Sequence, residues 1–274
     1  MKKIFISVDI EGMEGVVSNI QCSRGQSDFN IARKRLAGDV NAAVEACLDM
    51  GVEEIVVCDA HADAENIIIE DLHPEAKLIS GMIRSSLQME SFDASFDGLI
   101  VFGHSGGGMT YGGVIDHTWN GGKIYNIRMN GELMNTEAIL NAAVAGHYDV
   151  PLLAVIGYQA VGEEVTSRIE NVEAIVVKKG LARFSAESIH PSKARDLIYE
   201  GVKRAIEKAD TITPLKLDQP ITMEIDYIKS NTAETAALIP GVERITPRTV
   251  KVTADAETMF KLQNLMVFRL KDAY

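Results

Sequence analysis

Four stretches of this sequence end in side chains that can bind a metal ion or move a proton. An apolar run at the start is followed by Asp9 and Glu11, and two later runs are followed by His61 and His104. A glycine-rich loop further along carries His117. Ligands of open α/β sheets collect at the carboxyl ends of the strands, so these side chains could meet in one crevice. Carboxylates mixed with imidazoles suit zinc, manganese or cobalt, and a shared carboxylate can hold two such ions.

Alternating strands and helices are expected to position these residues. Apolar runs at 4–9 and 55–59 flank a helical pattern at 31–50, which predicts a parallel strand, helix, strand unit. The buried face of that helix would carry Ile31, Leu36, Val40, Val44 and Cys47. Further strands are expected at 77–80, 99–102, 152–157 and 172–177, with helices at 136–145 and 192–209. We therefore predict a three-layer α/β fold with a mostly parallel, mixed central sheet.

The last quarter of the chain has a different pattern. After residue 212 come short β-like pieces at 221–225 and 249–253 and a final helix at 256–271. We expect residues 1–212 to form a metal-binding catalytic α/β domain and residues 213–274 to form a smaller α+β domain. Within the first of these domains, a loop rich in glycine starts at residue 106 and leads into a strand-like run at 123–129. A loop of this length in a compact domain is usually functional.

Composition excludes several classes of function. The chain has 274 residues, with 27 basic and 39 acidic side chains and a net charge of −12. That charge repels nucleic acid and anionic membranes, so we expect neither as a partner. We find no signal peptide and no apolar stretch long enough to span a membrane, and we expect a cytoplasmic protein. Three cysteines without CxxC spacing argue against a disulfide framework or a thiolate zinc site.

Each candidate residue also has an ordinary explanation. Asp9 and Glu11 alone could be solvated loop acids, and His117 could be a plain exposed histidine rather than a proton carrier. Glu137 could serve the dipole of the helix that it opens, and Glu132 is an equally plausible carboxylate by local context. Two histidines at equivalent strand exits are harder to explain in this way, which favours a metal site.

Two other classes of function compete with a metal-dependent hydrolase. Residues 103–107 read GHSGG after an apolar strand and match the nucleophile elbow of serine hydrolases, with Ser105 as nucleophile and Asp149 and His190 as partners. An elbow must open into a helix, however, and the glycines that follow will not start one. The other rival is a non-catalytic metal-binding or scaffold protein, in which the same ligands form a saturated structural site.

The chain resembles the D-aminopeptidase family of zinc peptidases that bacteria encode with dipeptide-transport systems. The likeness covers nearly the whole chain and includes SVDIEG at 7–12, DAH at 59–61, LHPEA at 72–76, LISG at 78–81, GVIDH at 113–117 and NAAVAG at 141–146. By resemblance, Asp9 would bridge two zinc ions. Glu11 and His61 would complete one zinc site, His104 and Glu137 the other, and His117 would act in catalysis. Glu137 is preferred over Glu132 because it keeps register with 141–146.

The resemblance implies a binuclear zinc aminopeptidase that cleaves short peptides or amides with a free N-terminal amino acid, in particular a D-residue. Manganese or cobalt could replace zinc. A metal-dependent amidohydrolase acting on a small non-peptide molecule fits the same ligands. Family members form rings of five subunits stacked in pairs, so the resemblance also implies a decameric homo-oligomer.

Overall fold

The computed structural model describes residues 1–107 and 110–270. Its larger sheet has seven strands in the order β3–β2–β1–β4–β7–β8–β9. They are β1 (Lys3–Val8), β2 (Glu54–Asp59), β3 (Ala76–Ile79), β4 (Gly98–Phe102), β7 (Leu152–Tyr158), β8 (Glu173–Ala182) and β9 (Ser185–Ser188). Neighbours from β3 to β8 are parallel, and the edge strand β9 is antiparallel to β8. This confirms the predicted mostly parallel, mixed sheet.

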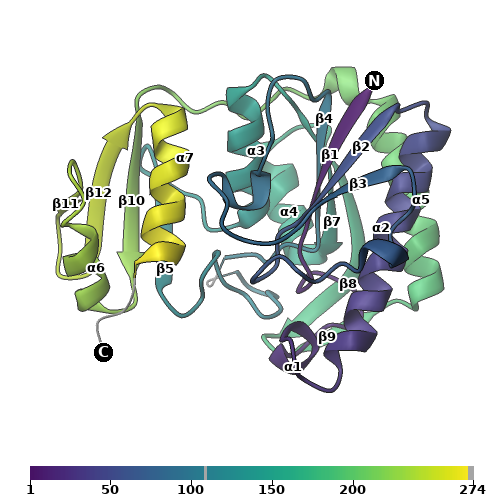
Figure 1. Cartoon of the computed structure of the whole chain (residues 1–274), viewed down its shortest axis with the longest axis horizontal. Coiled ribbons are helices and arrows are strands. Elements are labelled where there is room, and N and C mark those ends of the chain that lie inside the picture. Colours follow the sequence, from purple (N-terminus) through teal and green to yellow (C-terminus); the bar gives the residue numbers. More distant parts are fainter. Residues whose placement is uncertain (108–109, 271–274) are drawn as a thin grey trace.

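Helices cover both faces of this sheet (Figure 1). The helices α2 (Phe29–Asp49) and α5 (Pro191–Glu207) pack together on one face, and α3 (Glu137–His147) and α4 (Gln159–Arg168) lie on the other. A short helix, α1 (Asn19–Cys22), precedes α2. The central strands are buried on both sides, which explains why β4 is a continuous apolar run rather than an alternating one. The three predicted layers are therefore confirmed.

A second, antiparallel sheet lies beside the larger one (Figure 1). Its order is β11–β12–β10–β5–β6, with β5 (Ile124–Met129), β6 (Glu132–Leu133), β10 (Ile221–Tyr227), β11 (Glu243–Arg244) and β12 (Thr249–Ala254). Two helices, α6 (Ser230–Ala236) and α7 (Ala256–Asn264), pack with it, and a π-helical turn at Leu265–Arg269 follows. This sheet combines segments from both sides of residue 212, and a domain division at that residue stays a prediction.

The structure corrects three details of the expected elements. Ile31 is 55% exposed, because the buried stripe of α2 runs through Ala32, Leu36 and Val40 instead. The final α-helix ends at Asn264 rather than near residue 271. The helix α4 was not expected, because its sequence has few apolar residues and includes Gly162. In the structure this glycine lets α4 pack closely on β8, since an added Cβ would lie 3.2 Å from the Cβ of Ala174.

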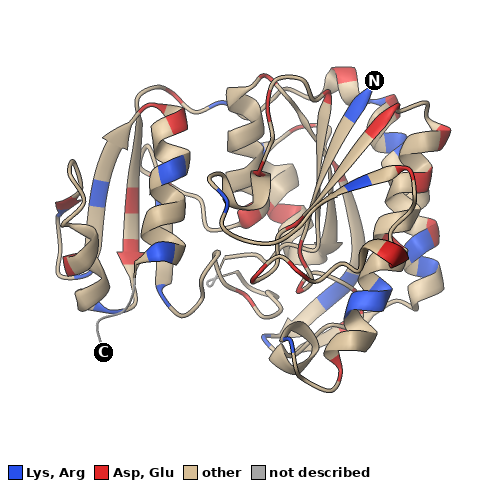
Figure 2. Cartoon of the chain, in the orientation of Figure 1, with Lys and Arg blue, Asp and Glu red and all other residues tan. Residues whose placement is uncertain are grey.

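Other general features match the composition. The three cysteines are free and buried. Charged residues of both signs are spread over the outer helices α2, α5 and α7 (Figure 2). Among the described residues, no helix combines the length and the apolar content needed to cross a bilayer.

Two buried carboxyl groups meet where the segment after β1 packs against α2. Glu14 is 1% exposed and Asp39 is fully buried, and the Nε of Arg195 donates to Asp39 Oδ1 over 3.0 Å. Among the described residues, neither oxygen of Glu14 nor Asp39 Oδ2 has a hydrogen-bond donor, and we infer that a shared proton joins the two carboxyls. Burial, and then the charge of Glu14, raise the pKa of Asp39 to about 8.

This pair makes the stability of the protein fall as pH rises. Asp39 loses its proton near its ordinary pKa of 3.8 in the unfolded chain but keeps it to about pH 8 when folded. Unfolding therefore releases a proton between those values, at a cost in stability of up to ~1.4 kcal/mol per pH unit. We expect Asp39→Asn to stabilise the protein by roughly 2 kcal/mol or more at pH 8 relative to its effect at pH 5.

Urea unfolding at pH 5, 6.5 and 8 measures this difference. Asp196→Asn on the exposed side of α5 is the matched control and should follow the wild-type curve at every pH. Parallel curves for Asp39→Asn and the wild type would show that the two carboxyls share no proton.

Candidate metal centre

The predicted site residues lie at the carboxyl edge of the large sheet. Asp9 follows β1 directly, and its N–H continues the ladder by donating to Phe102 O over 2.7 Å. His61 lies two residues beyond β2, and His104 two residues beyond β4. Since β1 pairs with β2 on one side and β4 on the other, Asp9 sits between the two histidines. The order of the strands thus explains the convergence that the sequence predicted.

A close backbone approach brings Glu11 into the same site. The N–H of Gly12 donates to the carbonyl of Gly103 over 2.6 Å, and a Cβ at Gly12 would lie only 2.6 Å from that carbonyl group. Only glycine allows the loops after β1 and β4 to approach so closely. Glu11 and His104, which adjoin these two glycines, are held near each other as a result.

The first ligand group consists of Asp9, Glu11 and His61. The Nδ1 of His61 lies 2.9 Å from Asp9 Oδ1 and 3.1 Å from Glu11 Oε1. Its other nitrogen, Nε2, lies 2.7 Å from the carbonyl oxygen of Cys22, which fixes the plane of the ring. A second-sphere carbonyl of this kind commonly orients a metal-binding histidine.

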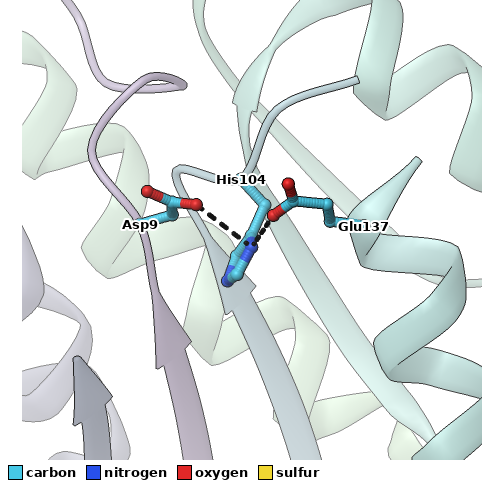
Figure 3. Close-up of side chains that lie close together, drawn as sticks. All are labelled: Asp9, His104 and Glu137. Atoms are coloured by element: carbon cyan, nitrogen blue, oxygen red, sulfur yellow. Dashed lines mark hydrogen bonds and ion pairs between the residues drawn. The ribbon is translucent and has the colours of Figure 1, made fainter. Parts of the chain in front are cut away.

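The second ligand group consists of Asp9, His104 and Glu137 (Figure 3). The Nδ1 of His104 lies 2.8 Å from Glu137 Oε2 and 3.6 Å from Asp9 Oδ2. The side chains come from the residue that follows β1, from the loop after β4 and from the first turn of α3. His104 Nε2 lies 3.0 Å from Ser7 Oγ, which itself donates to a backbone carbonyl and so fixes the imidazole.

The donor set fits a pair of divalent cations. The two oxygens of Asp9 face different groups, Oδ1 toward His61 and Oδ2 toward His104, which is the arrangement of a bridging carboxylate. Asp9, Glu11 and Glu137 are at most 4% exposed, and Glu11 Oε2 has no hydrogen-bond partner among the described residues. Three buried carboxylates are costly unless positive charge compensates them. Two cations ligated by carboxylate and imidazole would satisfy that requirement.

Electrostatics support the same interpretation. Burial alone would lower the pKa of His104, but the hydrogen bond that His104 donates to Glu137 and the charge of Asp9 raise it. Burial likewise opposes the charged form of His61, yet Glu11 and Asp9 raise its pKa well above the usual value. Burial opposes the charged form of Glu11, but the charge of His61 and the hydrogen bonds with His61 and Asp9 together outweigh burial and hold the pKa of Glu11 below its ordinary range. The carboxylates of the site therefore favour positive charge next to both imidazoles. A bound divalent cation can supply that charge.

A cavity of about 320 Å³ opens onto both ligand groups. Besides four of the five ligand candidates, it is lined by Ala60, Ala62, Gln88, His117, Trp119, Asn120, Gly121 and Phe268. Phe268 belongs to the π-helical turn after α7, so the second sheet and its helices contribute one wall of the cavity. This volume holds a short peptide end but not a folded polypeptide.

His117 faces this cavity from a strained loop. Ile115 and Trp119 on either side have φ angles of +52° and +53°, which cost side chains other than glycine about 1–3 kcal/mol each. The His117 ring lies with Nδ1 2.7 Å from the carbonyl oxygen of Ile115, so Nδ1 donates and Nε2 is left facing Glu137 Oε1 at 3.9 Å. Burial would lower the pKa of His117, but the charges of Glu11 and Glu137 raise it. Its Nε2 is thus placed to accept or donate a proton in the cavity.

The structure brings together all six predicted site residues and separates the alternative carboxylate. Glu137 is 1% exposed and also accepts from the Trp119 N–H over 2.8 Å. Glu132 lies on β6, where its side chain is 70% exposed and pairs with Arg168. Of the two glutamates that local context left open, only Glu137 can reach the site.

The residues of a serine triad do not meet. Ser105 Oγ is buried without a hydrogen-bond partner among the described residues, while Asp149 forms an ion pair with Lys216 and His190 caps α5. We expect Ser105→Ala to keep kcat within roughly threefold of wild type, because none of the described residues is a base that contacts this hydroxyl. Steady-state assays with and without a fluorophosphonate measure this. Complete inactivation by the substitution or by the fluorophosphonate would support the serine mechanism instead.

Several residues of the site gave no usable signal in the sequence. Gln88 is 94% buried, and its Nε2 donates to Glu137 Oε2 over 2.6 Å while its Oε1 accepts from Asn141. It follows Leu87, whose φ is +52°, in a segment without periodicity. Trp119 and Phe268 look like ordinary apolar residues in the sequence, and only their positions over the cavity distinguish them.

Fold and site together define a metal-dependent hydrolase, and the comparisons with known proteins agree. The model of the D-aminopeptidase family matches residues 1–267. A D-aminopeptidase of Bacillus subtilis (strain 168) is 31% identical over 268 residues, which cover 97% of this chain and 95% of that protein. The solved structure of the Zn-dependent D-aminopeptidase DppA from Bacillus subtilis, described as a self-compartmentalizing protease, matches with a TM-score of 0.93 and 30% identity over 96% of each chain. The chain belongs to the D-aminopeptidase family.

Proposed function

We propose that this protein is a binuclear zinc aminopeptidase that releases an N-terminal D-amino acid from short peptides or amides. The observation that carries the proposal is the position of Asp9, whose two carboxylate oxygens each face one of two ligand groups. Family membership and the zinc dependence of DppA support the choice of metal. Zinc bound there would activate water and polarise a peptide carbonyl.

Metal binding, proton transfer and substrate selection would fall to different residues of the chain. His61 and Glu11 would hold one ion and His104 and Glu137 the other, each imidazole being oriented by its own second-sphere oxygen. His117 would pass a proton between the attacking water and the leaving amine, since its Nε2 faces the cavity and its Nδ1 is held by Ile115. The cavity, closed on one side by Phe268, would limit substrates to short peptides.

We also propose that the chain forms a homo-oligomer with enclosed active sites. The description of DppA as a self-compartmentalizing protease supports this, and the family resemblance suggests a decamer of two stacked rings. Enclosure would exclude folded proteins, in agreement with the small cavity. A cytoplasmic location, where peptides imported by the cell would be available, stays a prediction from the sequence.

One experiment tests metal and substrate together. The purified protein is analysed for zinc per subunit and then assayed on D-Ala and L-Ala p-nitroanilides before and after chelation. We expect two zinc ions per subunit, preference for the D-isomer, loss of activity on chelation and recovery with added zinc. A single saturated zinc ion without amide cleavage would favour the structural metal site, and cleavage that resists chelation would rule out the metallohydrolase.

A further inference from the structure

A buried lysine on β8 holds the segment that carries Glu11. Lys178 is 2% exposed, and its Nζ donates to the backbone carbonyls of Glu11 and Val16 over 2.5 and 2.6 Å. Among the described residues, no carboxylate oxygen lies within 4.0 Å of this Nζ. Lysine is almost never fully buried without a charged partner, so its use here to bind two carbonyls calls for an explanation.

The two carbonyls lie at either end of one loop. Residues 11–16 leave the sheet after β1, and the side chain of Lys178 reaches both ends of this loop and closes it. The loop has further side-chain anchors at Gly15, whose N–H donates to Ser188 Oγ over 3.0 Å and whose carbonyl accepts from Gln21 Nε2 over 2.6 Å. Neither of these two anchors involves Glu11.

The two ligand groups depend on this loop to different degrees. Asp9 is fixed by the sheet, because its N–H donates to Phe102 and its Oδ1 accepts from Ile10. His104 and Glu137 are fixed by Ser7 and by Gln88. The carboxylate of Glu11, by contrast, contacts His61 through one oxygen and has no partner for the other among the described residues. Its position therefore depends on the backbone, which the Gly12–Gly103 hydrogen bond and Lys178 hold together.

Lys178 on β8 and its neighbour on β7 also support the loop that carries His117. Lys178 is the register partner of Tyr158, and its Nζ lies 5.7 Å from the centre of the Tyr158 ring. The hydroxyl of Tyr158 accepts from the N–H of Gly106, and the carbonyl of Gly106 accepts from the N–H of His117 over 3.0 Å. One buried pair of side chains on β7 and β8 thus supports both loops of the site.

We propose that Lys178 is a positioning residue of the metal centre, which fixes the loop at residues 11–16 and thereby aims the carboxylate of Glu11 at the zinc ion shared with His61 and Asp9. This inference rests on the proposed function. Removing the Nζ leaves two buried carbonyls without a donor and frees the loop to shift. The ligand group formed by His104 and Glu137 keeps its own supports.

The test measures zinc affinity at each site rather than activity alone. Zinc is titrated into the full-length apoprotein against a chromophoric chelator, and native mass spectrometry counts the ions bound. Loss of an outer-sphere support typically weakens metal binding about 10–100-fold. We expect Lys178→Met to weaken the binding of one zinc ion by such a factor while the other binds as in the wild type. Lys179→Met, on the exposed face of the same strand, is the matched control and should bind both ions normally.

A second, more conservative variant tests the inference in case Lys178→Met does not fold. Lys178→Gln keeps an N–H donor on a shorter side chain, and its zinc affinity should fall between those of the wild type and the Met variant. Wild-type affinity for both ions in either folded variant would overturn the inference. Failure of both variants to fold would also overturn it, because Lys178 would then be a residue of the core. A wild type that binds fewer than two zinc ions would refute the proposed function instead, whatever the variants do.

Discussion

Replacing Asp9 with alanine is expected to abolish binding of both zinc ions and to lower kcat/KM by roughly 10³-fold or more. The reason is geometric. Asp9 is the one residue common to the two ligand groups, and each of its oxygens faces a different histidine. Each group would keep only one carboxylate and one imidazole without it. By comparison, the loss of Glu11 or Glu137 would leave one group complete.

The measurement is zinc content per subunit together with steady-state kinetics on a D-alanyl substrate. Glu132→Ala is the control, because that carboxylate is 70% exposed on β6 and should keep both ions and full activity. Thermal unfolding of the apoproteins checks that Asp9→Ala still folds, which we expect because removing one of three clustered acids reduces their repulsion. An Asp9→Ala protein that kept one tightly bound zinc ion would show that the two groups are not bridged.

The site residues that follow the strands could be predicted from the sequence, because their positions depend on the local apolar pattern and on the order of parallel strands. Apolar runs alternating with helical segments imply parallel strands, and parallel strands end at the same edge. Asp9, His61 and His104 follow such runs within two residues, so their meeting follows from the sheet order. Glu137 was predicted through register with 141–146, a property of the family resemblance rather than of spacing alone.

The remaining parts depend on contacts between segments that are far apart in sequence. β5 pairs with β10, about a hundred residues later, and the sequence of neither strand identifies the other as its partner. Gln88 reaches Glu137 from a segment with no regular period, and Phe268 enters the cavity from the last turn of the described chain. Lys178 lies beside the exposed Lys179 in β8, and its carbonyl partners are recognisable only in three dimensions. Such supporting residues are set by tertiary packing, which periodicity does not encode.

His117→Ala is expected to retain both zinc ions but to lower kcat by about 10²–10⁴-fold, the usual contribution of a positioned acid–base group. His117 belongs to neither ligand group, and its nearest carboxylate contact is 3.9 Å from Nε2. Zinc content should therefore be unchanged. KM should change little, because the substrate would still meet the same metal ions and cavity walls. The loss should appear in kcat, where a proton must move between water and the leaving amine.

The strain around His117 makes this prediction specific. Positive φ angles at Ile115 and Trp119 cost stability on both sides of one histidine, which supports a functional role for its placement. Added imidazole should restore part of the activity of His117→Ala, since the cavity left by the ring faces the substrate. His147→Ala, at the exposed end of α3, is the control and should behave as the wild type. Full kcat in a zinc-loaded His117→Ala protein would remove its catalytic role, whereas loss of zinc would make it a ligand.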